Sequence, residues 1–102
     1  MEKMIKDGHV AVLYSPGFGA GWSTWNQEYP EMMFDPVIVQ YVEREEWETL
    51  ETYVTLRYPD AYTGAMKDLK VAWIPQGTMF RVTEYDGSES VETKDNINWL
   101  IA

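Results

Sequence analysis

The first apolar run of the chain covers residues 9–14 (His-Val-Ala-Val-Leu-Tyr), where hydrophobic side chains occupy successive positions. A short run that is apolar on both faces and rich in strand formers predicts a buried strand. Pro16 and the glycines after it end this strand. Residues 15–34 then lack strong periodicity, apart from one helical turn expected near residues 23–27. Loops of this length inside a small domain are commonly functional.

Helical spacing dominates the middle of the chain. Asp35-Pro36 is a favourable helix start, because Asp caps the first amides and Pro fits the first helical position. Apolar residues then recur at helical spacing, at Val37, Ile38, Tyr41, Val42, Trp47, Leu50, Val54 and Tyr58. The pattern fits one bent helix or two helices that meet near residues 44–45, and Pro59 ends it.

The last third of the chain has strand patterns separated by turn signals. We predict strands at residues 69–74, 78–85, 88–93 and 97–101, with a hairpin turn at Asp86-Gly87. The expected fold is one α+β domain over residues 1–102, with a mostly antiparallel sheet and helix packed on one sheet face. Along the chain it has an N-terminal strand, a Gly/Trp-rich loop, one or two helices and a C-terminal β-meander.

Composition limits the cellular compartments and the classes of binding partner that we expect. The chain has 102 residues, 45% of them hydrophobic, which suits one domain with a real core. Its net charge of −9 argues against direct nucleic-acid binding and suits solubility, a basic protein partner or mimicry of a polyanion. The absence of cysteine excludes disulfides and thiol chemistry. No segment is apolar enough for a signal peptide or a membrane span, so we expect a cytoplasmic protein with no membrane partner.

The densest candidate chemistry lies in residues 15–26, which we call the recognition loop. After Ser15-Pro16 it contains three glycines, one phenylalanine, two indoles and two hydroxyls, at Gly17, Phe18, Gly19, Gly21, Trp22, Ser23, Thr24 and Trp25. Successive amides of such a loop can hold an anion, the hydroxyls can donate to phosphate, and an indole can stack on a base. The third glycine comes one residue too early for G-x-G-x-x-G, and no Gly-Lys-Ser/Thr occurs.

The tryptophans can also have a structural role. The glycines can instead form a tight loop that lets Trp22 and Trp25 fold back onto the sheet. On a helical turn these two indoles would share a face, because they are three residues apart. Trp47, Trp73 and Trp99 lie in predicted helix or strand positions, where packing is the better interpretation.

A second candidate cluster surrounds the predicted hairpin. Arg81, Tyr85 and Ser88 can form an anion clamp beside the recognition loop, since arginine binds phosphate and carboxylate groups well. The alternative for Arg81 is a cross-strand ion pair with Glu89 or Glu92.

Catalysis and metal binding have little support in the residues. The single histidine, His9, has no cysteine partner and no marked Ser-His-Asp arrangement. Carboxylates such as Asp60, Asp68, Asp86 and Glu89 follow no EF-hand spacing. We therefore expect no catalytic residues, no metal and no cofactor. The acidic residues between positions 43 and 51 predict a charged helix face, either solvated or able to dock on a basic surface.

Two segments, VLYSPGFGAGWSTW at residues 12–25 and WIPQGTMFRVTEYDGSES at residues 73–90, carry a family resemblance. They resemble a family of small acidic proteins of tailed phages and prophages. The resemblance spans most of the chain, and the helical middle is its least distinctive part. The family has no assigned activity, so the resemblance gives no residue a role. It implies an early phage protein acting in bacterial cytoplasm. Proteins of that description often counter host defence, by sequestering nucleotide messengers in oligomeric cages or by blocking a host protein.

Three functions follow as hypotheses. The first is a non-catalytic, homo-oligomeric protein that binds and sequesters a small nucleotide-like signalling molecule. Its ligand-binding residues would be Gly17, Phe18, Gly19, Gly21, Trp22, Ser23, Thr24, Trp25, Arg81, Tyr85 and Ser88. The second is an acidic inhibitor, or nucleic-acid mimic, that blocks a host defence protein through its helix face or exposed aromatics. The third is an enzyme that degrades such a signal.

Overall fold

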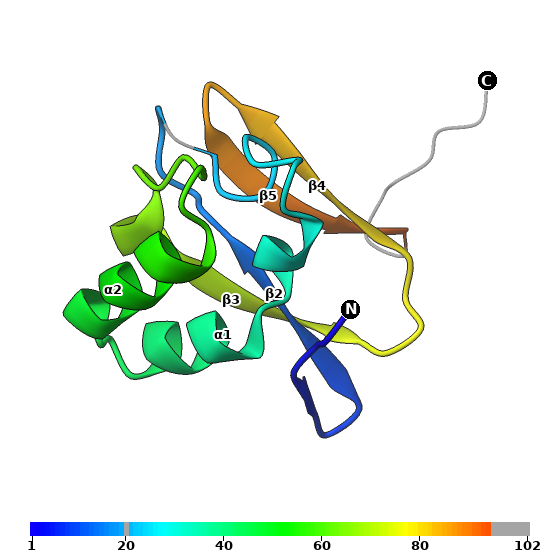
Figure 1. The fold of residues 1–102 in the computed structure, drawn as a ribbon. Coiled ribbons are helices and arrows are strands. Elements are labelled where there is room, and N and C mark those ends of the chain that lie inside the picture. The colour runs from blue at the N-terminus through cyan, green and yellow to red at the C-terminus, as the bar shows by residue number, and fades with distance from the viewer. Residues whose placement is uncertain (20, 95–102) are drawn as a thin grey trace.

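The computed structural model describes residues 1–19 and 21–94 (Figure 1). The elements run in the order β1 (Ile5–Lys6), β2 (His9–Tyr14), η1 (Pro30–Met33), α1 (Pro36–Glu43), α2 (Trp47–Arg57), η2 (Met66–Asp68), β3 (Lys70–Pro75), β4 (Phe80–Tyr85) and β5 (Ser88–Thr93). The predicted α+β class is confirmed, with all described strand pairs antiparallel. The strand predicted at 97–101 lies outside the described residues.

One antiparallel sheet has the strand order β1-β2-β3, so that the apolar strand β2 is central. β2 pairs with β3 along its whole length, from His9 opposite Pro75 to Tyr14 opposite Lys70. β1 joins β2 through Asp7 and Gly8, whose φ angles of 51° and 76° are those of a type I′ turn. This short N-terminal hairpin was not predicted.

β4 and β5 form a second, two-stranded sheet, and its turn is at Asp86-Gly87 as the sequence predicts. The expected meander is wrong in one respect, because β3 pairs with β2 and not with β4. The turn after β3 explains the difference. The Gln76 amide donates to the Gly8 carbonyl, so the chain after Pro75 is tied to the first hairpin instead of reversing directly into β4.

The helical region consists of two helices instead of one bent helix. α1 begins as predicted, with the Asp35 carboxylate accepting from the amides of Val37 and Ile38 at 2.9 and 3.4 Å. Glu45 between the helices has a φ of 55°, which interrupts the helical hydrogen bonding. The helical turn expected at residues 23–27 does not form. That segment makes successive turns, and η1 follows it.

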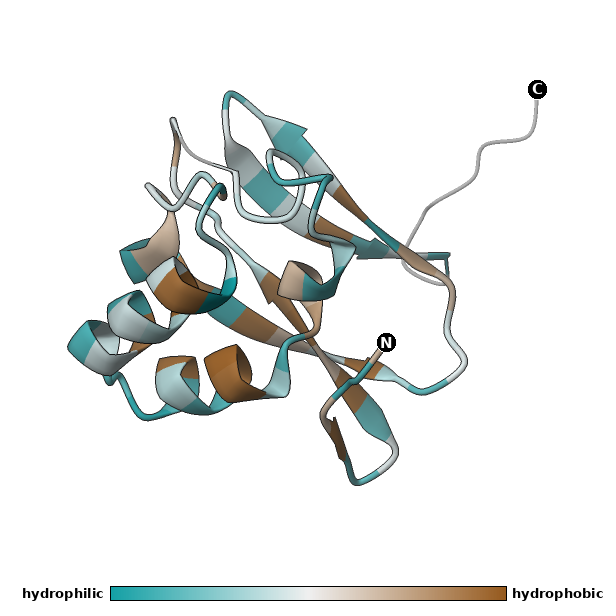
Figure 2. Cartoon of the chain, viewed as in Figure 1, coloured by the Kyte–Doolittle hydropathy of each residue, from teal (hydrophilic) through white to brown (hydrophobic). Residues whose placement is uncertain are grey.

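The core lies between the helices and the face of the first sheet that carries Ala11 and Leu13. Both residues are fully buried, together with Trp22 of the recognition loop. β2 also contacts β5, and a Phe34–Phe80 ring contact at 6.0 Å joins β4 to the segment before α1. Figure 2 shows the hydrophobic residues concentrated on β2, β3 and α1. None of the helices in the described ranges is long and apolar enough to cross a membrane.

Candidate functional site

The recognition loop leaves β2 and runs along the β4–β5 hairpin. The Glu89 amide donates to the Ser15 carbonyl at 2.7 Å, and the Ser88 hydroxyl donates to the Pro16 carbonyl at 2.7 Å. The Gly19 amide donates to the Asp86 carbonyl at 2.6 Å. The loop therefore lies along the hairpin, as we expected when we placed the Arg81, Tyr85 and Ser88 cluster beside it.

The buried side chain of Glu89, on β5, accepts hydrogen bonds from two positions of the recognition loop. One carboxylate oxygen accepts from the Ser15 amide at 2.9 Å. The other accepts from the Thr24 amide at 2.9 Å and from the Thr24 hydroxyl at 2.6 Å. Glu89 is only 1% exposed, and no described lysine or arginine forms an ion pair with it. The loop thus binds an anion, as its amides suggested, but that anion is a side chain of the same protein.

Trp22 is part of the core. It is completely buried, and its indole Nε1–H donates to the Met32 carbonyl at 2.8 Å. Ser23 is also buried, and its hydroxyl has no hydrogen-bond partner among the described residues. These two predicted ligand-binding side chains therefore do not face solvent.

Asn26 fixes the second half of the loop to the segment after α2. Its side-chain amide donates to the carbonyls of Trp22 and Tyr62 at 2.6 and 2.8 Å, and its oxygen accepts from the Tyr62 amide at 2.7 Å. Trp25 lies against Tyr62, with ring centroids 5.2 Å apart. The expectation that Trp22 and Trp25 share a face is wrong. The segment forms successive turns, so the Trp22 indole points inward, whereas Trp25 is 42% exposed.

The glycines of the loop serve close approach and backbone conformation. Gly19 has a φ of 83°, which favours glycine. A Cβ atom at Gly21 would lie 2.6 Å from the Thr24 hydroxyl and 2.6 Å from Trp25 Cδ1. A Cβ atom at Gly17 would lie 2.6 Å from the Asp68 carboxylate.

Arg81 does not contribute a free positive charge. Its Nε donates to the Glu92 carboxylate at 2.9 Å, and the two residues are directly opposite each other in the β4–β5 ladder. Of the two ion pairs that the sequence offered, the one with Glu92 is formed.

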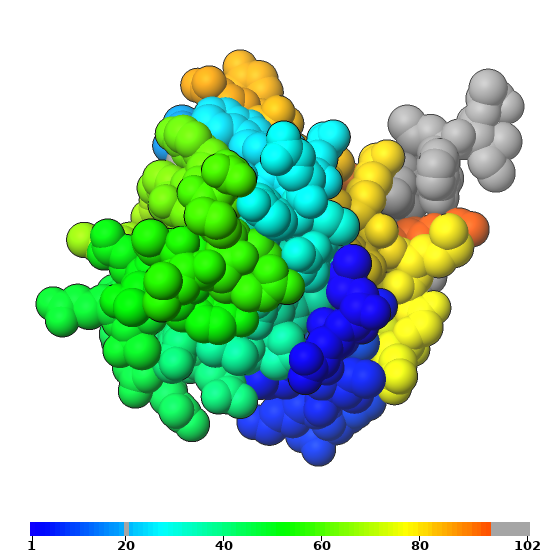
Figure 3. Space-filling view, in the orientation of Figure 1, coloured from blue at the N-terminus to red at the C-terminus, as the bar shows by residue number. Residues whose placement is uncertain are grey.

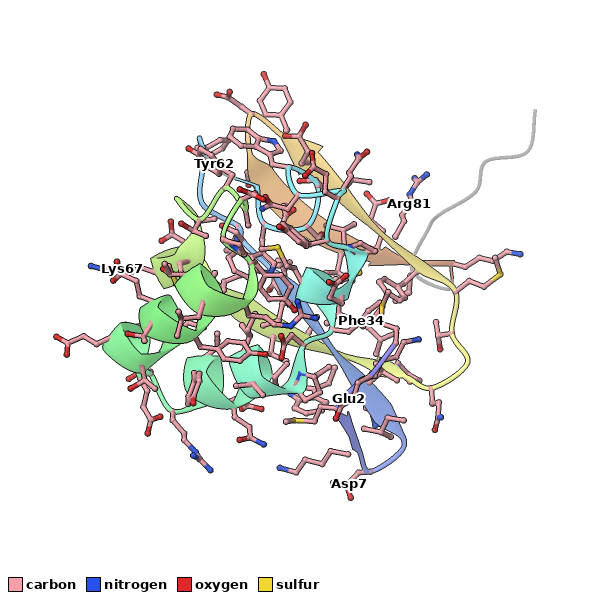
Figure 4. All side chains as sticks on the ribbon, in the orientation of Figure 1. Glu2, Asp7, Phe34, Tyr62, Lys67 and Arg81 are labelled. Carbon is pink, nitrogen blue, oxygen red and sulfur yellow. The ribbon has the colours of Figure 1, made fainter. Side chains whose placement is uncertain are left out.

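Four large aromatic side chains instead project outward around the loop: Phe18, Trp25, Tyr62 and Tyr85, exposed by 74%, 42%, 48% and 79%. We call this group the aromatic end. The hairpin tip, residues 22–29 and the segment after α2 adjoin at one end of the molecule (Figures 1 and 3). Figure 4 shows Tyr62 at this end. Neither Tyr62 nor Asn26 was singled out from the sequence, since nothing local marks a residue that contacts a loop more than thirty positions away.

A cavity of about 430 Å³ adjoins the Trp25–Tyr62 pair. Its lining includes the carboxylates of Glu28 and Asp60, both exposed residues, and no lysine or arginine from the described part of the chain. Aromatic faces beside carboxylates favour a cationic group.

A second buried carboxylate, Asp35, serves the fold. It accepts from the hydroxyls of Tyr53 and Tyr58 at 2.8 and 2.7 Å, in addition to capping α1. Burial, and then the hydrogen bond to Asp35, raises the pKa of Tyr53 to about 12 and raises the pKa of Tyr58 further. These tyrosines lock α2 to the start of α1 and are neutral donors at physiological pH.

No family model, curated protein or solved structure matches the chain. Within the described ranges, no group of three or more His, Cys, Asp or Glu side chains is arranged to hold a metal ion.

Proposed function

We propose that this protein is a non-catalytic acidic binding protein that docks on a basic surface of another protein through its aromatic end. One observation carries the proposal. The Ser15 amide and the Thr24 amide and hydroxyl point inward to Glu89, while the same loop and its neighbours direct aromatic rings outward. Exposed aromatic side chains on an ordered scaffold are typical of protein interfaces.

The cavity beside Trp25 and Tyr62 supports a basic partner. A guanidinium or ammonium group there would face the aromatic pair and the carboxylates of Glu28 and Asp60. The net charge of −9 would also steer a basic protein toward this surface. The resemblance to phage proteins implies a bacterial host defence protein as the partner.

Sequestration of a nucleotide-like signal by the recognition loop has less support. In that function the loop amides and the Thr24 hydroxyl would hold phosphate, but they already bind Glu89. Trp22 would stack on a base, but it is buried, and Arg81 is paired with Glu92. A ligand at this site would have to displace an internal carboxylate.

The cavity is tested with a small probe of defined chemistry. We expect Nα-acetyl-arginine amide to shift the NMR signal of the Trp25 indole in the millimolar range, and Nα-acetyl-citrulline amide, which is neutral and nearly isosteric, to leave it unchanged. The double variant E28Q/D60N should lose the response, and E48Q, on an exposed part of α2, should keep it. An equal shift with both probes, or none with either, contradicts a cation-binding role.

Docking itself is tested by quantitative capture from bacterial lysate with matched variants. We expect the double variant F18S/Y85S to lose a stoichiometric partner, and L56S, which replaces an equally exposed apolar residue on α2, to keep it. Charge reversal at Glu46, Glu48 and Glu51 tests the helix face, the other acidic surface. If only that charge reversal abolishes capture of the partner, the interface is on α2 and not at the aromatic end.

A further inference from the structure

Among the described strands, β3 is at the edge of its sheet, with one side open. It pairs with β2 on one side, and no described residue bonds to the backbone of Val71 or Trp73 on the other. Open edges of this kind accept another strand unless they are blocked.

The direction of each backbone group on β3 follows from the neighbouring ladder. The Ala11 amide donates to Met4 on the β1 side, and the Gln76 amide donates to Gly8 on the β3 side. Antiparallel ladders alternate, so Val10, Val12 and Tyr14 bond to β3 and engage Ile74, Ala72 and Lys70. Val71 and Trp73 therefore direct their N–H and C=O groups to the open edge.

This open edge is complementary to itself. If a second β3 lies antiparallel to the first with a two-fold axis at Ala72, Val71 of each copy faces Trp73 of the other. Each such pair exchanges two backbone hydrogen bonds, so four form in total. Pro75 has no N–H, and its carbonyl already accepts from the Thr78 amide, so the pairing ends there.

The surface beside the open edge of β3 contains a groove and carries charges of both signs. A groove of about 620 Å³ is lined by residues from both faces of β3, including Val71, Trp73 and Lys70, and by Trp47 at the start of α2. Its charged residues are Glu43, Glu45, Asp68, Lys67 and Lys70. Neither lysine forms an ion pair with a described residue. Figure 4 shows Lys67 projecting from the surface. A surface that carries both signs can face its own copy although the whole chain has a net charge of −9.

We infer that β3 is a self-association edge, on which a second copy of the chain adds its own β3 to make one continuous sheet of six strands. Val71 and Trp73 of the two copies would then be cross-strand neighbours on the face that packs against the helices. This inference does not depend on the aromatic end or on its partner.

Single cysteines give a position-specific test, because the chain has no cysteine of its own. In the proposed pairing the two Ala72 residues face each other in a non-hydrogen-bonded position, with Cα atoms about 4.5 Å apart, which suits a disulfide. Lys70 lies on the same face of the strand, but its two copies would be roughly 13 Å apart. We expect A72C to form a covalent dimer under mild oxidation and K70C, the matched control, to remain monomeric on denaturing gels.

The unmodified protein should sediment at micromolar concentration with twice the 11.9 kDa mass of one chain. V71P removes two of the four proposed intermolecular donors and none that bonds to β2, so we expect the dimer to dissociate at least about tenfold more readily. A monomeric native protein, equal crosslinking of A72C and K70C, or an unchanged V71P dimer would overturn the inference. A monomer whose Val71 and Trp73 amides resist hydrogen exchange would assign the edge to a strand of the same chain.

Discussion

Replacing Glu89 with Gln tests whether an internal carboxylate holds the recognition loop. The substitution keeps the size of the side chain but exchanges one carboxylate oxygen for an NH2 group. If this group faces the Ser15 amide, two donors meet; if it faces Thr24, the bonds from that amide and hydroxyl are both lost. Either orientation leaves at least one buried donor without an acceptor.

The expected cost follows from the number and kind of these bonds. Hydrogen bonds to a charged group contribute about 1.5–3 kcal/mol each, and an unsatisfied buried donor costs about 1–3 kcal/mol. The variant also removes a buried charge that has no described ion-pair partner, and this offsets part of the destabilisation. We therefore expect E89Q to lower the free energy of unfolding by about 2–4 kcal/mol.

Urea unfolding followed by tryptophan fluorescence measures this change. The matched control is E92Q on the same strand, where the carboxylate is 38% exposed and pairs with a side chain that is 67% exposed. Exposed pairs contribute about 0–1 kcal/mol, so the control should be nearly neutral. Hydrogen exchange of the Ser15 and Thr24 amides should accelerate in E89Q only.

A result in which E89Q and E92Q unfold at the same urea concentration with equal m-values would refute this account of the loop. So would a destabilised E89Q whose Ser15 and Thr24 amides exchange no faster, relative to the rest of the chain, than in the parent protein. The loop would then be held without this carboxylate, by Trp22, Asn26 and the backbone bonds to the hairpin.

Other substitutions test the packing of the loop and the hydrogen bonds from Tyr53 and Tyr58 to Asp35. G21A should cost about 1–3 kcal/mol in urea unfolding, because its Cβ would press on the Thr24 hydroxyl that Glu89 holds, whereas G17A would press on an exposed, movable carboxylate and should stay within about 0.5 kcal/mol. Equal effects would contradict this difference. The raised pKa of Tyr53, about 12, contributes stability that is complete below the unfolded pKa of 10.0 and is lost as the pH rises through about 12. The unfolding free energy of Y53F should therefore fall less than that of the parent between neutral pH and about pH 11, and parallel decreases would exclude the effect.

Features encoded by neighbouring residues could be predicted from the sequence. Asp35-Pro36 caps α1 with local hydrogen bonds, and Asp86-Gly87 adopts the positive φ angles that its hairpin requires. The Asp7-Gly8 turn obeys the same rule, yet it was missed because the strand before it has only two residues.

The role of Glu89 could not be predicted, because its partners are distant in the sequence. Ser15 is 74 positions away and Thr24 is 65 positions away. A glutamate in an alternating strand pattern is usually exposed, and only the folded arrangement of loop and hairpin makes this one a buried acceptor. Trp22 was ambiguous for a related reason, since the pattern cannot tell whether an indole in a glycine-rich loop points inward.

The recognition loop joins two properties that usually indicate different functions. Its amides converge on an anion, as in phosphate-binding loops, but the anion is Glu89, which the chain holds in place at high effective concentration. An external phosphate would compete with this carboxylate for the Ser15 and Thr24 amides, in a loop that the Gly19–Asp86 and Ser88–Pro16 bonds also tie to the hairpin. The same bonds tie the backbone to the hairpin next to Phe18 and Tyr85, which project into solvent. Aromatic side chains that are held in place before binding lose less entropy on binding than mobile ones, which is one reason why we propose a protein partner over a small anionic ligand.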